Sequence, residues 1–109
     1  MKENDYFVIA YKILAYLYEC LKESEDVDKD LISPEGLDIN EKYHNWIFKA
    51  LHEEGRITGV YDIGGSNYVK ISYSELAITE AGIIFLQENS GIERAKTFLK
   101  DLKAMIPGA

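Results

Sequence analysis

The chain has 109 residues, of which 47% are hydrophobic, and its formal net charge is −7 at pH 7; this length favours a single domain, residues 1–109, around one core. A lone cysteine, Cys20, excludes an intrachain disulfide, and no stretch approaches the roughly 20 apolar residues that span a bilayer. Because acidic residues interrupt the N-terminal region that is basic in a signal peptide, we expect a cytoplasmic protein without membrane contact.

The first predicted element is a helix from Tyr6 to Glu23, in which apolar residues recur at helical spacing. Cys20 lies on this stripe and is expected to be a small core residue, because a catalytic thiol needs a nearby histidine and a positive environment. The stripe is widened on one flank by Phe7, Tyr11, Leu14 and Tyr18. A face this broad needs more than one neighbour, or a partner chain, to cover it.

The acidity of the chain lies in one segment. Residues 19–41 hold nine acidic and two basic residues, whereas residues 42–109 hold eight of each. Residues 24–30 are charged and polar, which predicts a solvated loop. Their acidic residues lack the spacing of a calcium-binding loop. Leu31 and Ile32 indicate a short strand. Ser33-Pro34-Glu35 then offers a capping hydroxyl, a proline for the first helical position and an acid, and predicts about one turn of helix.

A second long helix is predicted from Asp38 to Glu54. Asp38 with Glu41 resembles a capping box, and Gly55 is placed to be a left-handed C-terminal cap. Ile39, Tyr43, Ile47, Ala50 and Leu51 form its core stripe, with Trp46 at the edge. Its outward face carries Glu41, Lys42, Asn45, Lys49, His52 and Glu53, with His44 and Phe48 at the border.

Two β-type runs, Arg56 to Tyr61 and Tyr68 to Ile71, flank a glycine-rich connection and predict a hairpin over about 56–71. Leu76 to Ile78 is a short extended stretch, and Thr79 caps a helix that runs to about Asn89. A capping-box pattern at 90–93 begins a last helix over about 91–106. This order is the linear pattern of a winged helix, an α+β fold. Residues 38–54 would be the presenting helix and the hairpin the wing.

Several of these segments together resemble the YjcQ family. They are residues 51–60, LHEEGRITGV, residues 76–82, LAITEAG, the opening helix with its Tyr-Lys-Ile-Leu sequence, and the lysine-rich last helix. The resemblance covers about residues 5–105. It implies a small winged-helix-like protein of Gram-positive bacteria and their prophages, and it supplies no functional residues to carry over.

The sequence contains few residue patterns that indicate a catalytic or metal-binding site. His44 and His52 are the only histidines, and eight residues apart on a helix they cannot share one zinc ion. The glycines at 64–65 lack the frame of a phosphate-binding loop, and no G-x-S-x-G nucleophile elbow is present. We therefore predict a protein that is not an enzyme and needs no metal or cofactor.

The candidate contact residues lie on the outward face of helix 38–54 and on the wing, and they are Lys42, His44, Asn45, Trp46, Phe48, Lys49, Ser66, Asn67 and Lys70. Asparagine and lysine can read base edges in the major groove, which permits a DNA-binding transcriptional regulator. Residues 40–55, however, carry a net charge of −1, and phosphate binding draws on clustered basic residues.

We therefore expect a protein partner that contacts Trp46 and Phe48, with DNA binding as the alternative. The same residues are also compatible with an ordinary solvated helix face that binds nothing. A further alternative is that the protein is a structural part of a virion. The chain is expected to be a monomer or a homodimer formed through the last helix.

Overall fold

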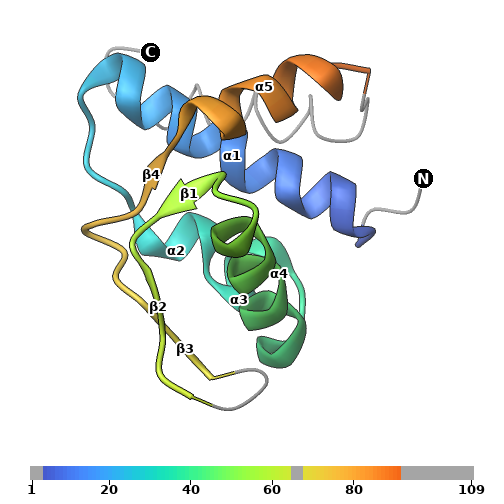
Figure 1. Cartoon of the computed structure of the whole chain (residues 1–109), viewed down its shortest axis with the longest axis vertical. Helices are drawn as coiled ribbons and strands as arrows, with labels where there is room; N and C mark the ends of the chain where they lie inside the picture. The colour runs from blue at the N-terminus through green and yellow to red at the C-terminus, as the bar shows by residue number, and fades with distance from the viewer. Residues whose placement is uncertain (1–3, 65–67, 92–109) are drawn as a thin grey trace.

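The computed structural model describes residues 4–64 and 68–91, and its elements form an α+β, winged-helix-like fold, as predicted (Figure 1). In chain order the elements are α1 (Tyr6–Glu23), α2 (Lys29–Ile32), α3 (Pro34–Leu37), α4 (Glu41–Glu53), β1 (Ile57–Thr58), β2 (Val60–Asp62), β3 (Val69–Ile71), β4 (Ala77–Ile78) and α5 (Glu80–Glu88). The predicted helix over 91–106, and with it the predicted homodimer contact, lies outside the described residues beyond Gly91.

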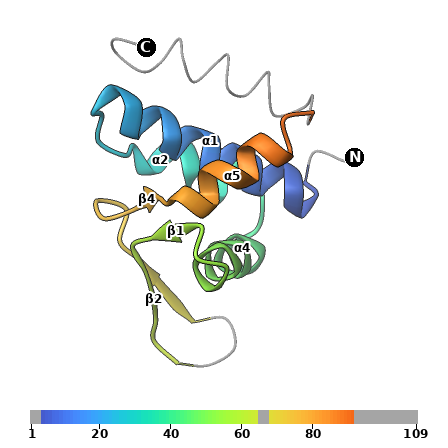
Figure 2. The ribbon, with the colours of Figure 1, turned by 45° about the horizontal axis from the view of Figure 1, so that its top comes forward.

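Helix α1 is the central element of the core, and it begins and ends at the predicted residues. It contacts α4, β4 and α5, so buried side chains occur around most of its circumference. Cys20 is only 6% exposed, which confirms its place in the core. Helices α1 and α5 lie side by side, and β1 and β4 lie between this pair and the projecting hairpin (Figures 1 and 2).

The segment between α1 and α4 is helical where a strand was predicted. Leu31 and Ile32 belong to α2, whose N-terminus is capped by the Asp28 carboxylate accepting the Asp30 N–H at 3.0 Å. The β-branched Ile32 is fully buried without a strand partner, so tertiary packing overrides its strand propensity. The one-turn helix after it is confirmed, because the Ser33 hydroxyl caps α3 by accepting the Gly36 N–H at 3.1 Å.

Helix α4 begins later than predicted. Its N-cap is Asn40, whose side-chain oxygen accepts the Tyr43 N–H at 2.8 Å. The predicted capping box at Asp38 is wrong, because Asp38 adopts a left-handed conformation, φ 55°, that closes α3. At the other end the predicted left-handed cap is confirmed, since Gly55 adopts φ +70° directly after Glu54, the C-cap residue of α4.

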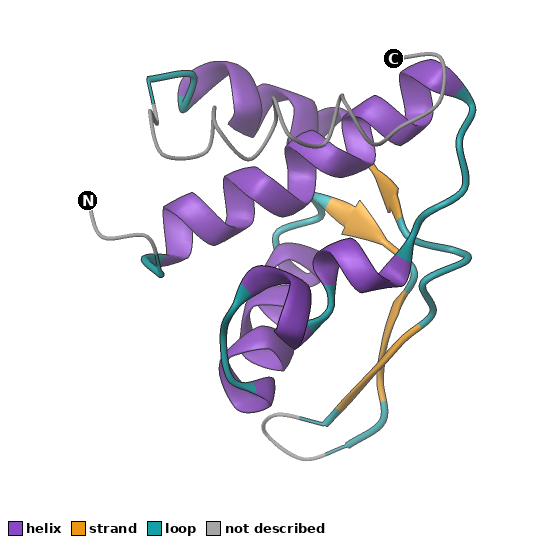
Figure 3. Ribbon diagram, turned by 180° about the vertical axis from the view of Figure 1, so that it is seen from behind, coloured by secondary structure: helices purple, strands orange, loops and turns teal. Residues whose placement is uncertain are grey.

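The predicted hairpin is confirmed, but its first run is divided into two strands. Gly59, at φ +93°, separates β1 from β2. Strand β2 pairs with β3 as an antiparallel hairpin that projects from the helices (Figure 3), whereas β1 pairs antiparallel with β4. The Thr79 hydroxyl then caps α5 as predicted, accepting the Gly82 N–H at 3.2 Å.

Candidate functional site

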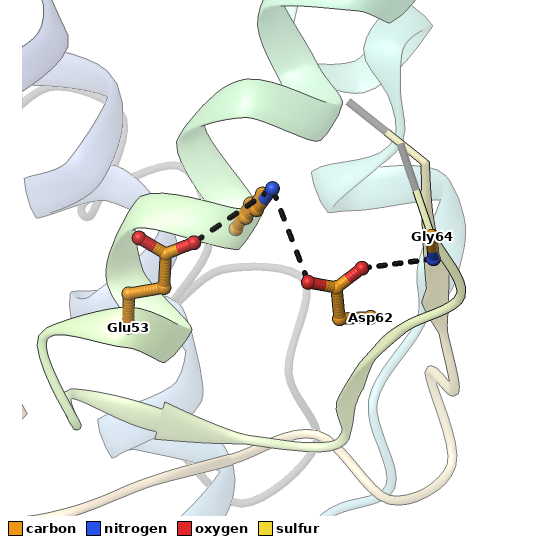
Figure 4. A network of polar contacts seen from close by, with 4 residues as sticks. Glu53, Asp62 and Gly64 are labelled. Carbon is orange, nitrogen blue, oxygen red and sulfur yellow. Dashed lines mark hydrogen bonds and ion pairs between the residues drawn. The ribbon is translucent and has the colours of Figure 1, made fainter. Parts of the chain in front are cut away.

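The outward face of α4 and the adjacent hairpin are joined by a carboxylate–lysine network. The Lys49 ammonium lies 3.8 Å from the Glu53 carboxylate on the same helix and 4.0 Å from the Asp62 carboxylate at the end of β2 (Figure 4). Asp62 also accepts the Gly64 N–H at 3.0 Å, which holds its side chain at the start of the turn. Two carboxylates therefore lie beside Lys49, the lysine that would read bases in the alternative interpretation as a DNA-binding regulator.

The charge of this face is balanced rather than basic. Over residues 41–71, which span α4 and the hairpin, four basic side chains, Lys42, Lys49, Arg56 and Lys70, are matched by four acidic ones, Glu41, Glu53, Glu54 and Asp62. Lys42 and Lys70 are exposed, as predicted for contact residues. A surface that neutralises phosphates needs an excess of basic groups. In the described part of α4 and the hairpin, the basic groups do not outnumber the acidic ones.

Two of the predicted contact residues are not on the surface. His44 is 1% exposed and Phe48 is 0% exposed, and their rings stack with centroids 4.5 Å apart. The Nε2 atom of His44 lies 2.7 Å from the carbonyl oxygen of Ile32 in α2, so the ring ties α4 to α2. The prediction that both residues border the outward face is wrong, because both side chains are buried, His44 against the end of α2.

The remaining predicted residues divide between half-buried, exposed and undescribed positions. Asn45 is half-buried, and its side-chain oxygen lies 3.3 Å from Nδ1 of His44. Trp46 is 49% exposed, in agreement with its predicted place at the edge of the core stripe. Ser66 and Asn67 lie outside the described residues.

Trp46 belongs to a series of ring contacts that we call the aromatic surface, formed by Tyr6, Phe7, Trp46 and Phe85. Trp46 meets Tyr6 edge-to-face at 5.7 Å between ring centroids, and Tyr6 meets Phe7 edge-to-face at 5.4 Å. Phe7 then stacks on Phe85 of α5 at 6.3 Å. Such offset and edge-to-face contacts stabilise ring positions beyond simple burial.

The aromatic surface has a buried side, at Phe85, and an exposed side, at Phe7 and Trp46. The guanidinium of Arg56 lies 4.8 Å from the Phe85 ring, which is itself buried. Burial raises the pKa of the Tyr6 phenol above its ordinary value, although Arg56 beside it opposes the shift. Phe7, by contrast, is 48% exposed, almost the same fraction as Trp46.

A hollow of about 470 Å³ adjoins Trp46, lined by Asn40, Lys42, Tyr43 and Trp46. The Tyr43 hydroxyl donates a hydrogen bond to the carbonyl oxygen of Asn4 at 2.7 Å, so the chain before α1 is tied down beside it. The aromatic surface thus combines two half-exposed rings with an adjacent recess, as at protein-binding surfaces.

Sequence reasoning found Trp46 but missed Tyr6, Phe7 and Arg56. Phe7 was predicted only to widen the apolar stripe of α1, on a flank that needs a neighbour or a partner chain to cover it, and it was not named as a contact residue. The contact of Tyr6 with Trp46 on α4 and that of Phe7 with Phe85 on α5 join residues far apart in the sequence, which periodicity does not report.

Among residues 4–64 and 68–91, no group of three or more histidine, cysteine, aspartate or glutamate side chains is placed to hold a metal ion. Within the same residues, no helix has the length and apolar character needed to cross a membrane.

Comparison with known proteins places the chain in a family. No curated protein and no solved structure matches it. The family model described as YjcQ protein matches residues 11–105, which is most of the chain and nearly the span over which the sequence resembles that family. The chain therefore belongs to the YjcQ protein family.

Proposed function

We propose that this protein is a non-catalytic binding module whose protein partner docks on the aromatic surface. The observation that carries the proposal is the exposure of Trp46 and Phe7, each about half exposed, in one continuous series of ring contacts. Tryptophan and other aromatic residues are enriched at the centres of protein interfaces. Rings already held by neighbouring rings lose little side-chain freedom when a partner binds.

The charge layout supports a protein partner over DNA. Lys49 has Glu53 and Asp62 beside it, so a phosphate approaching α4 would meet carboxylates as well as the lysine. Phosphate contacts position a DNA-binding protein and supply much of its affinity. A balanced face offers little of that attraction and leaves apolar contact as the main source of binding energy.

Affinity capture tests the proposal when two double variants are compared. Phe7→Ala with Trp46→Ala removes the exposed rings, and Tyr61→Ala with Tyr68→Ala removes two exposed rings of the hairpin as the control. Truncating an aromatic residue that acts as an interface hot spot costs about 2 kcal/mol or more of binding free energy. We therefore expect a captured protein to be depleted at least about tenfold by the first variant only. Equal capture by the wild type and the first variant would refute the proposal, provided circular dichroism shows that both variants are folded.

DNA binding is measured separately by fluorescence anisotropy with pooled genomic duplexes at about 50 mM salt, where electrostatic affinity is strong. We expect no saturable binding by the wild type. Glu53→Gln with Asp62→Asn removes the two carboxylates beside Lys49, and it should increase DNA affinity because those carboxylates repel phosphate. Tight binding by the wild type, weakened by Lys49→Ala or Lys70→Ala, would instead favour the DNA-binding regulator.

The proposal extends to a prophage-associated role in the cytoplasm, an extension that rests on the family alone. Gene neighbourhood tests it directly, because flanking repressor, head or lysis genes would place the chain in a phage module. Neighbours drawn only from host metabolism would remove this part of the proposal and leave the binding surface unaffected.

A further inference from the structure

A second surface lies at the other end of α1. There the last turns of α1 meet the following segment, residues 24–29, and the segment that leads into β4, residues 73–78 (Figure 1). Between them is a groove of about 660 Å³, which we call the acidic groove. The aromatic surface involves the first turn of this 18-residue helix. At about 1.5 Å per residue, the two surfaces are separated by roughly 15–25 Å along the helix.

The floor of the acidic groove is apolar. Its apolar lining includes Leu17, Leu21, Val27, Tyr73, Leu76 and Ile78. Leu21 is 58% exposed although it lies on α1, the helix that forms the centre of the core. An exposed leucine beside a recess of buried and half-buried apolar side chains can receive the apolar face of another element.

The rim of the groove is negative. Glu25 and Asp26 line it, and among residues 4–64 and 68–91 neither carboxylate makes an ion pair. Lys29 also lines the groove, while Lys22 lies 2.8 Å from the Glu19 carboxylate and 4.4 Å from the centre of the Tyr18 ring. Residues 19–30 hold six acidic and two basic side chains, a net charge of −4.

We propose that the acidic groove binds a basic amphipathic helix of a partner protein. Apolar residues of that helix would pack on Leu21, Val27 and Leu76, and its lysine or arginine side chains would face Glu25 and Asp26. This is the helix-in-groove mode of recognition, in which apolar anchors recur at intervals of three and four residues. An added β-strand fits less well, because β4 has only two residues to pair with it, and the carboxylates repel nucleic acid.

Peptide binding to the full chain tests this proposal. The probe is a fluorescent synthetic helix of roughly 18 residues, with leucines at positions i, i+3, i+4 and i+7 and lysines elsewhere; a second probe has glutamates in place of the lysines. We expect saturable one-to-one binding of the lysine probe at about 150 mM salt, a condition that screens distant charges. The glutamate probe should bind at least about tenfold more weakly.

Two variants and one matched control separate the groove from general electrostatic attraction. Glu25→Lys with Asp26→Lys should weaken the binding of the lysine probe about tenfold. Glu41→Lys with Glu88→Lys changes the net charge equally at exposed positions outside the groove, and it should change the affinity less than about twofold. Leu21→Ser should weaken binding about fivefold through lost apolar contact; because this side chain is mostly exposed, the fold should tolerate the change.

Equal losses in the two charge variants would overturn the proposal, as would an unchanged affinity of Leu21→Ser. Phe7→Ala with Trp46→Ala should leave probe binding intact, since those rings belong to the other surface. The acidic groove and the aromatic surface can therefore fail independently of one another.

Discussion

The buried histidine of α4 gives the most direct test of the fold around the proposed binding surface. The His44 ring is 1% exposed, its Nε2 lies 2.7 Å from the Ile32 carbonyl oxygen, and its face stacks on Phe48. Because a carbonyl oxygen can only accept, Nε2 is the donor of this hydrogen bond. Ile32 ends α2, so its carbonyl is one of those that a helix leaves without an internal partner.

The change His44→Ala should destabilise the protein by about 3 kcal/mol. Leaving a buried acceptor unsatisfied costs about 1–3 kcal/mol, and losing the packing of a buried ring adds about 1–2 kcal/mol. His44→Phe keeps a ring against Phe48 but removes the donor, so it should show chiefly the first of these two costs. The wild-type free energy of unfolding for a chain of this size is about 5–15 kcal/mol, so the alanine variant should remain folded.

Urea unfolding followed by far-ultraviolet circular dichroism measures the effect. With a denaturant slope of about 1–3 kcal/mol per molar, the midpoint should fall by about 1–3 M. His52→Ala is the matched control, because His52 is exposed on the same helix, and its unfolding free energy should change by less than about 0.5 kcal/mol. A loss below about 1 kcal/mol for His44→Ala, or equal losses at the two histidines, would refute the burial of the His44 side chain of α4 against α2.

Three further predictions concern the turn before the wing, the free thiol and the response to alkaline pH. Gly59→Ala should destabilise by about 3 kcal/mol or more, because φ is +93° and the added Cβ would lie 2.7 Å from backbone atoms. Gly55→Ala, at φ +70° in open space, should cost only about 1–2 kcal/mol in the same urea measurement. Burial raises the pKa of the Cys20 thiol, so Ellman's reagent at pH 8 should modify the native chain at least about tenfold more slowly than the urea-unfolded chain; equal rates would place the thiol at the surface. Burial also raises the pKa of the Tyr16 phenol above its ordinary value of 10.0, so the unfolded chain loses this proton first. The free energy of unfolding should therefore hold below about pH 10 and fall as the pH rises beyond it, with a smaller fall in Tyr16→Phe; an identical pH dependence in the variant would contradict the assignment.

Local hydrogen bonding explains which parts of the fold could be predicted from the sequence. Ser33 and Thr79 cap helices through their own side chains, and Gly55 ends α4 through its own conformation. These are interactions within a few residues, so a short stretch of sequence determines them. The start of α4 was mispredicted because Asp38 and Asn40 are both good N-caps. The choice between them depends on where α3 ends.

Packing between distant segments explains what the sequence could not show. The periodicity of α4 places His44 at the border of its apolar stripe, but the ring is 1% exposed and its Nε2 contacts the Ile32 carbonyl oxygen of α2, which periodicity does not report. A two-residue run such as Leu31-Ile32 is too short to distinguish strand from helix by period. The contact between Tyr6 and Trp46 joins residues on two separate helices, so no local pattern marks it.

The charges of the two proposed surfaces explain how a winged-helix-like chain can serve protein partners. In a DNA-reading winged helix, the presenting helix and the wing face the same phosphates. Here Asp62 at the end of β2 faces Lys49 of α4, so these two elements offset each other's charge. DNA binding would have to separate that pair and then place two carboxylates near phosphate. Protein binding at the aromatic surface or at the acidic groove requires no ion pair to separate and places no carboxylate near a phosphate, because the first surface is largely apolar and the second is negative. The balance of charge, more than the order of helices and strands, therefore favours protein partners for this chain.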